Sequence, residues 1–127
     1  MKLGNDPPSA LRLTPLEQAV LGSLADSLGA AGAALRAQAG RVRVVNRAHS
    51  GVGFITKLET PEDTAGLPVE AAGRVRAIYA SHPQLQEPAQ FLVQMKAGRL
   101  AAIEAFCYAG MWPADDAGFH VEAAPAR

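Results

Sequence analysis

One carboxylate stands where the strand pattern expects an apolar residue. The alternating segments 89–96 and 99–108 predict a β-hairpin that turns at residues 97–98. Counting outward from a two-residue turn pairs Phe91 with Glu104 and places Glu104 among the apolar side chains of one sheet face. A carboxylate in such surroundings must be paired, protonated or facing a cavity. Glu104 is therefore the first candidate for chemistry.

Two interpretations of Glu104 follow from this placement. In the first, Glu104 forms a buried structural ion pair with Arg43 or Arg47. The strand predicted over residues 41–48 can bring either arginine to the same face. Replacing Glu104 with alanine would then leave a buried arginine without a counter-ion and lower the free energy of unfolding by about 2–4 kcal/mol. In the second, Glu104 faces a ligand in an apolar pocket, where it could act as a general acid or base.

Aromatic residues gather where the last predicted strand ends. Tyr108 and Trp112 stand there with Met111, and they either close the edge of the core or line a small pocket. Arginine and tryptophan are also the residue types that most often anchor protein interfaces. The candidate ligand or partner contacts are therefore Glu104, Arg43, Arg47, Tyr108 and Trp112.

Other reactive residue types lack the neighbours that catalysis or metal binding would need. Ser50 follows His49, but adjacent residues on a strand point in opposite directions and no nucleophile elbow surrounds the serine. Cys107 is the only cysteine, and we predict that it is a small buried apolar residue. The three histidines show no metal-ligand spacing. We therefore predict no catalytic set, no cofactor and no metal.

The charge balance argues against a nucleic-acid protein. The chain of 127 residues has 12 Lys+Arg and 12 Asp+Glu. A regular strand would align Arg41, Arg43, Arg47 and His49 as a basic ladder, which could hold phosphates. A net charge of zero provides no general attraction to nucleic acid, and the acidic segment 59–70 is the expected partner of the ladder.

The elements that must position these residues begin with a helix. Thr14-Pro15-Leu16-Glu17 is a capping box with proline at the first helical position. Apolar residues then recur at spacings of three and four until Gly40. Glycines at both ends of the segment 29–32 predict a bend or break there.

The pattern changes from helix to strand after Gly40. The segments 41–48 and 52–60 predict a first hairpin joined at 49–51, the segment 74–80 a third strand, and the 97–98 hairpin the last two strands. The fold class is α+β, with an N-terminal helix packed on one face of a roughly five-stranded antiparallel sheet.

We expect three regions along the chain. Residues 1–13 form a loose N-terminal lead-in, residues 14–112 a single α+β domain, and residues 113–127 a poorly ordered tail. A single cysteine, the absence of an apolar leader and the absence of long apolar runs predict a cytoplasmic protein with no membrane segment.

Two motifs resemble a group of small uncharacterised bacterial proteins. These proteins share a Gly-Val-Gly-Phe hairpin, here Gly51-Val52-Gly53-Phe54, and a Glu-aromatic-Trp-Pro ending, which runs here from Glu104 to Trp112-Pro113. The resemblance covers roughly residues 45–113. It implies no known activity and transfers no catalytic residue.

The sequence favours a non-enzymatic binding or protein-interaction module of unknown partner. We expect a homodimer, because one helix covers only one sheet face and Ala25, Gly29 and Ala33 form a row of small residues that a second helix could approach. The alternative is a small enzyme or small-molecule-binding protein that uses Glu104 in an apolar pocket.

Overall fold

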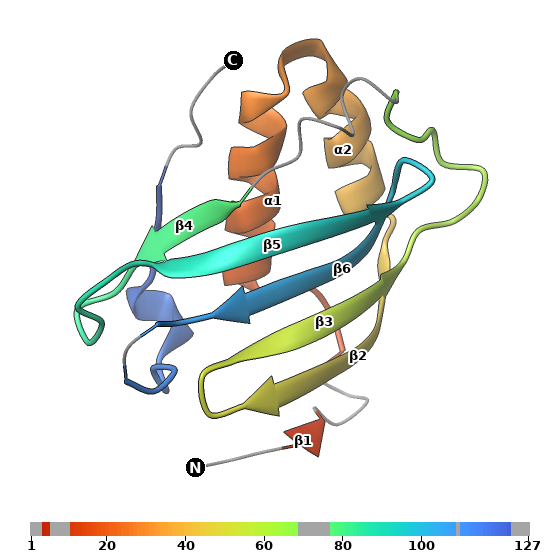
Figure 1. The fold of residues 1–127 in the computed structure, drawn as a ribbon. Helices are drawn as coiled ribbons and strands as arrows, with labels where there is room; N and C mark the ends of the chain where they lie inside the picture. Colours follow the sequence, from red (N-terminus) through yellow and green to blue (C-terminus); the bar gives the residue numbers. More distant parts are fainter. Residues whose placement is uncertain (1–3, 6–10, 69–76, 109, 123–127) are drawn as a thin grey trace.

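The computed structural model describes residues 4–5, 11–68, 77–108 and 110–122. They form an α+β fold in which helices pack on one antiparallel sheet, as the sequence predicts (Figure 1). The helices are α1 (Pro15–Ser27) and α2 (Gly32–Ala39), and two 3₁₀ turns cover Gly29–Ala31 and Asp116–Gly118. The strands are β1 (Gly4–Asn5), β2 (Arg43–Ser50), β3 (Gly53–Glu59), β4 (Ile78–Ser81), β5 (Ala89–Lys96), β6 (Arg99–Phe106) and β7 (His120–Val121).

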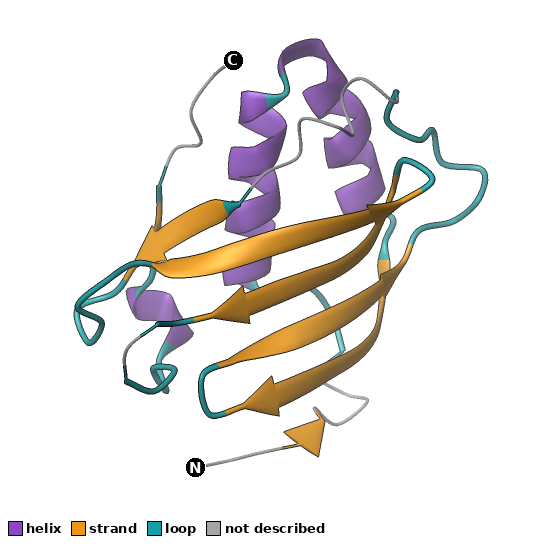
Figure 2. Ribbon diagram, viewed as in Figure 1, coloured by secondary structure: helices purple, strands orange, loops and turns teal. Residues whose placement is uncertain are grey.

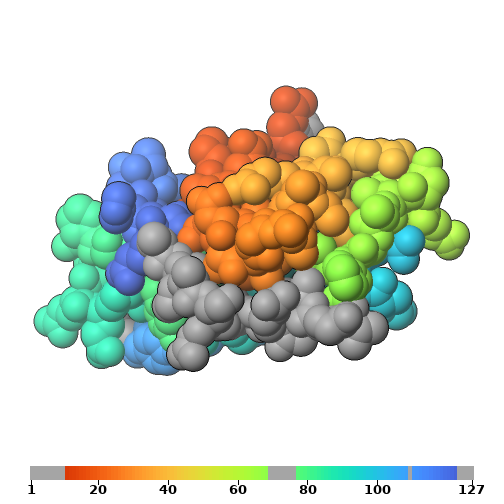
Figure 3. All heavy atoms as spheres, turned by 90° about the horizontal axis from the view of Figure 1, so that it is seen from above, coloured from red at the N-terminus to blue at the C-terminus, as the bar shows by residue number. Residues whose placement is uncertain are grey.

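The sheet has the order β1-β2-β3-β6-β5-β4-β7, and every neighbouring pair is antiparallel. Both helices lie behind it in the view of Figure 2, so the face toward the reader carries no helix. Seen from above, the helices form one layer between the loop that follows β3 and the C-terminal segment (Figure 3). We call the uncovered side of the sheet the open face.

The predicted capping box begins α1. The amide of Glu17 donates to Thr14 Oγ1 at 3.1 Å, and the amide of Thr14 donates to Glu17 Oε1 at 2.9 Å. The predicted break is also confirmed, because α1 ends at Ser27 and α2 starts at Gly32. A Cβ on Gly32 would lie 2.2 Å from the carbonyl oxygen of Ala25, so the small residues let α1 and α2 of one chain approach closely.

A buried charge cluster ties α1 to the sheet. Glu17 of α1 is fully buried, and Arg47 of β2 is 3% exposed. The Arg47 guanidinium donates to both Glu17 carboxylate oxygens, at 2.5 and 3.2 Å, and to Thr56 Oγ1 of β3 at 3.1 Å. Thr56 in turn donates to Glu17, and Arg47 also donates to the carbonyl oxygen of Arg12 at 2.8 Å. Together these bonds join the lead-in, α1, β2 and β3.

A buried amide makes a second tie at the other end of the helical layer. Gln38 of α2 is fully buried, and its Nε2 donates to the carbonyl oxygens of Ala65 and Gly98 at 3.0 and 2.9 Å. The amide of Leu100 donates to Gln38 Oε1 at 2.9 Å. The Gln38 side chain therefore holds two segments against α2, namely the β5–β6 turn and the loop after β3 that contains Ala65.

The first hairpin turns two residues later than predicted. Strand β2 continues through Ser50, and the turn is formed by Gly51 and Val52. Gly53 follows because β3 and β6 are very close there: a Cβ on Gly53 would lie 1.8 Å from the carbonyl oxygen of Ala105. The other predicted turn, at residues 97–98, is confirmed, with a positive φ at both positions.

The C-terminal segment differs from the predicted tail. Residues 116–118 form a 3₁₀ turn, β7 pairs with β4, and the amide of Glu122 donates to the carbonyl oxygen of Tyr79 at 2.8 Å. Phe119 and Val121 pack against the core, although alanine, proline and scattered acids surround them in the sequence. Residues 123–127 lie outside the described part of the chain, as do residues 74–76 of the predicted third strand, of which 78–80 form most of β4.

We predict that Glu17→Gln destabilises the protein by about 3–5 kcal/mol, because it leaves the Arg47 charge buried without a counter-ion. The matched control is Glu59→Gln, which removes the same charge from an ion pair whose side chains are 62% and 69% exposed, and we expect it to cost less than about 1 kcal/mol. Denaturant unfolding measures both. Equal costs would contradict the stated role of the cluster.

Candidate functional site

The sheet places Glu104 on the face opposite to the predicted one. Near the turn the register is as expected, with Met95 opposite Leu100. The next pair is Gln94 with Ala102, so Ala101 is an extra residue in β6 and forms a β-bulge. This one-residue shift turns every following side chain to the other face, and Glu104 lies opposite Leu92 instead of Phe91.

The bulge places apolar side chains in the core and turns the Glu104 side chain away from it. Ile103 and Ala105, which the turn count places away from the core, are 0% and 2% exposed beneath the helices. Burying them is worth more than burying an unpaired carboxylate. The sequence shows that Ile103 and Ala105 are apolar and Glu104 is charged. The turn at residues 97–98, from which the register is counted, does not indicate a bulge in the strand that follows.

Glu104 therefore lies in the middle of the open face. Its register partners are Ile55 on β3 and Leu92 on β5, and the residue is half-buried between them. Within the described residues its carboxylate has no hydrogen bond and no ion pair. The predicted pair with Arg43 or Arg47 is therefore wrong, and the stability cost predicted for Glu104→Ala loses its physical basis.

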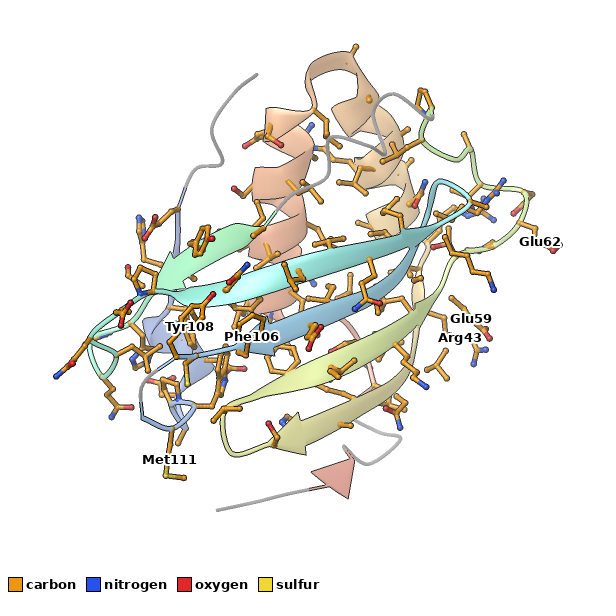
Figure 4. The ribbon with its side chains drawn as sticks, viewed as in Figure 1. Arg43, Glu59, Glu62, Phe106, Tyr108 and Met111 are labelled. Atoms are coloured by element: carbon orange, nitrogen blue, oxygen red, sulfur yellow. The ribbon has the colours of Figure 1, made fainter. Side chains whose placement is uncertain are left out.

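The two candidate arginines lie on different faces of β2. Val45 is an extra residue in that strand, because Val44 pairs with Leu58 and Asn46 with Lys57. The bulge directs Arg47 under the helices, whereas Arg43 forms an exposed ion pair with Glu59 at the far end of β3 (Figure 4). The predicted basic ladder does not form.

The predicted pairing of basic residues with the acidic segment 59–70 is confirmed. Arg43 pairs with Glu59, and Arg41 pairs with Asp63 at 3.1 Å.

Tyr108 belongs to the open face and not to the core edge. It is 57% exposed and lies edge-to-face against Phe106, with ring centroids 5.5 Å apart (Figure 4). Its hydroxyl donates to Gln90 of β5. The two rings extend the apolar surface that Ile55 and Leu92 form around Glu104.

Trp112 lies on the other side of the sheet, as predicted for a residue at the core edge. Its ring centroid is 5.5 Å from that of Phe54, 5.9 Å from Phe91 and 4.9 Å from Phe119. Its amide donates to the carbonyl oxygen of Gly51 at 2.9 Å, which anchors the C-terminal segment to the β2–β3 turn. Trp112 and Tyr108 are thus neighbours in sequence that serve different surfaces.

A cavity of about 480 Å³ opens beside Trp112. It lies between the end of β2, the start of α1 and the segment 111–116, and we call it the Trp112 cavity. Its walls combine aromatic rings with titratable groups, namely Phe54, Trp112, Arg47, His49 and Asp116. Two larger hollows, of about 660 and 620 Å³, flank α1. Glu104 lines none of the three.

Asp116 has an altered proton affinity at this cavity. Partial desolvation raises the pKa of its carboxyl group above the ordinary value of 3.8, and the hydrogen bond from the Trp112 indole opposes the increase. The negative charge of Glu17 adds to the increase, whereas His49 and Arg47 reduce it. Asp116 lies in the predicted tail, and no sequence pattern marks it as a group beside a cavity.

Two further reactive side chains are buried, and Cys107 has its predicted role as a small buried residue. Cys107 is buried, and desolvation raises the pKa of its thiol, which disfavours the nucleophilic thiolate. His82 is buried against Phe119 and makes a ring-nitrogen hydrogen bond of 3.0 Å with the carbonyl oxygen of Asp115. Across the described ranges, no three His, Cys, Asp or Glu side chains are grouped so that they could hold a metal ion.

Comparisons with known proteins add no family. No family model, curated protein or solved structure gives a significant match to the chain. In the described part of the chain, no helix is long and apolar enough to span a lipid bilayer.

We predict that a ¹³C NMR titration places the pKa of Asp116 above 3.8, and that Trp112→Phe raises it further by removing the indole donor. Because the folded pKa is the higher one, Asp116 favours the folded state most at low pH, and this contribution is lost as pH rises through the folded pKa. Asp116→Asn should abolish that component. A lower pKa in Trp112→Phe would contradict the assignment of the hydrogen bond.

Proposed function

We propose that this protein is a non-enzymatic protein-interaction module whose binding surface is the open face of the sheet. The observation that supports it is Glu104, a half-buried carboxylate without a partner among the described residues, set between Ile55 and Leu92. Such a group is tolerated while water reaches it. An apolar partner that covered it without supplying a cation would leave a charge desolvated and unpaired.

The partner we propose is a second copy of the chain. Lys57 is exposed on the open face and pairs with Ala102, two residues along β6 from Glu104, so the two opposite charges are diagonal neighbours. A twofold axis that runs between two stacked sheets, perpendicular to the line from Glu104 to Lys57, would set each Glu104 against the other copy's Lys57. The surrounding apolar side chains of both copies would be buried by the same contact.

The row of small residues formed by Ala25, Gly29 and Ala33 does not support this dimer. Ala25 is 1% exposed and contacts α2 of the same chain, so the row of small residues is partly used within the monomer. The proposal therefore rests on the open face alone.

A charge exchange tests the proposal. Analytical ultracentrifugation should show a dimer for the unaltered chain, and Glu104→Lys and Lys57→Glu should each raise its dissociation constant at least about tenfold, or about 1.4 kcal/mol, through like-charge contacts. The chain carrying both substitutions should recover the dimer. Glu62→Lys makes the same charge change on an exposed loop residue and should have no effect.

Two results would contradict it. A monomer at high micromolar concentration would exclude self-association through this face. A dimer that survives both single substitutions would place the interface elsewhere.

A further inference from the structure

We propose that the Trp112 cavity binds a flat aromatic ring that carries a cationic nitrogen group. The inference concerns the helix-covered side of the sheet and is independent of the open face. It rests on the shape of the cavity, on its rigid aromatic walls and on the charges at its polar end.

Two aromatic rings form a corner of the cavity wall. Phe54 and Trp112 contact each other edge-to-face, with an interplanar angle of 88° and their centroids 5.5 Å apart. Trp112 is held from behind by stacking on Phe119 at 4.9 Å and from its backbone by the bond to Gly51. Walls fixed in this way lose little freedom when a ligand enters, and an indole ring attracts cations that approach its face.

The charges at the polar end favour a cation. Arg47 contributes to the cavity wall, but its charge is neutralised by Glu17, which it contacts through two hydrogen bonds. Asp116 carries a carboxylate that accepts from the Trp112 indole, and a carboxylate has about four acceptor positions, so it can accept further donors. His49 and Ser50 add groups that can donate or accept hydrogen bonds.

The size of the cavity agrees with a small ligand. A volume of about 480 Å³ falls within the range of about 300–1,000 Å³ that is typical of ligand sites. It suits a compound of one or two rings. Met111, which is 54% exposed, also lines the cavity and leaves a flexible apolar side chain for a ligand to contact.

The test uses two probes of the same shape and opposite charge, benzamidine and benzoate. Trp112 is the only tryptophan, so its fluorescence reports directly on the cavity wall. Benzamidine should give a saturable change with a dissociation constant on the order of 1 mM, as expected for so small a ligand, and benzoate should bind at least about tenfold more weakly. The indole N–H signal in a ¹H–¹⁵N NMR spectrum should shift with the same midpoint.

Substitutions at two adjacent acids make the assignment specific. Asp116→Asn should weaken benzamidine binding at least about tenfold, because it removes the charge and keeps the shape. Asp115→Asn is the matched control, since its amide oxygen can still accept from the amide of Ala117, as Asp115 does at 2.9 Å. Binding of benzoate as tight as that of benzamidine, unchanged binding to Asp116→Asn, or no saturable signal with benzamidine would each overturn the proposal.

Discussion

The bond network between Arg47, Glu17 and Thr56 determines how this protein is assembled. Glu17 serves two purposes with one carboxylate, since it completes the cap of α1 and neutralises an arginine from the sheet. A buried ion pair is tolerated only when its hydrogen bonds are complete, and every buried side-chain nitrogen and oxygen in the described ranges has a partner. The first turn of α1 is therefore fixed against β2 and β3 in one position.

This attachment explains why the two sides of the sheet differ. The helices cover the side on which Arg47 and Thr56 lie, and the buried Gln38 secures the other end of the same layer. Among the described residues no helix covers the opposite side, where Glu104 is half-buried and Ile55 and Lys57 are exposed. The network also contributes Arg47 to the wall of the Trp112 cavity, so one cluster separates a covered side with a cavity from the open face.

Local chemistry allowed much of the fold to be predicted, whereas the candidate site depended on details that local rules miss. The capping box, the break before Gly32 and the turn at residues 97–98 each follow from a few adjacent residues. The faces of β2 and β6 follow from bulges at Val45 and Ala101, which arise from competition for burial across the whole sheet. Glu17 was recognised as a cap, but its partner is 30 residues away and no local pattern indicates it.

Amide hydrogen exchange in Arg47→Met tests the central claim that the charge cluster attaches α1 to the sheet. This substitution keeps an apolar stem but leaves Glu17 without its cation. The account predicts that the amides of α1 lose protection by a local opening, while the amides paired between β5 and β6 stay protected by a larger free energy. Equal loss of protection in α1 and in the β5–β6 hairpin, or no loss in α1, would contradict it.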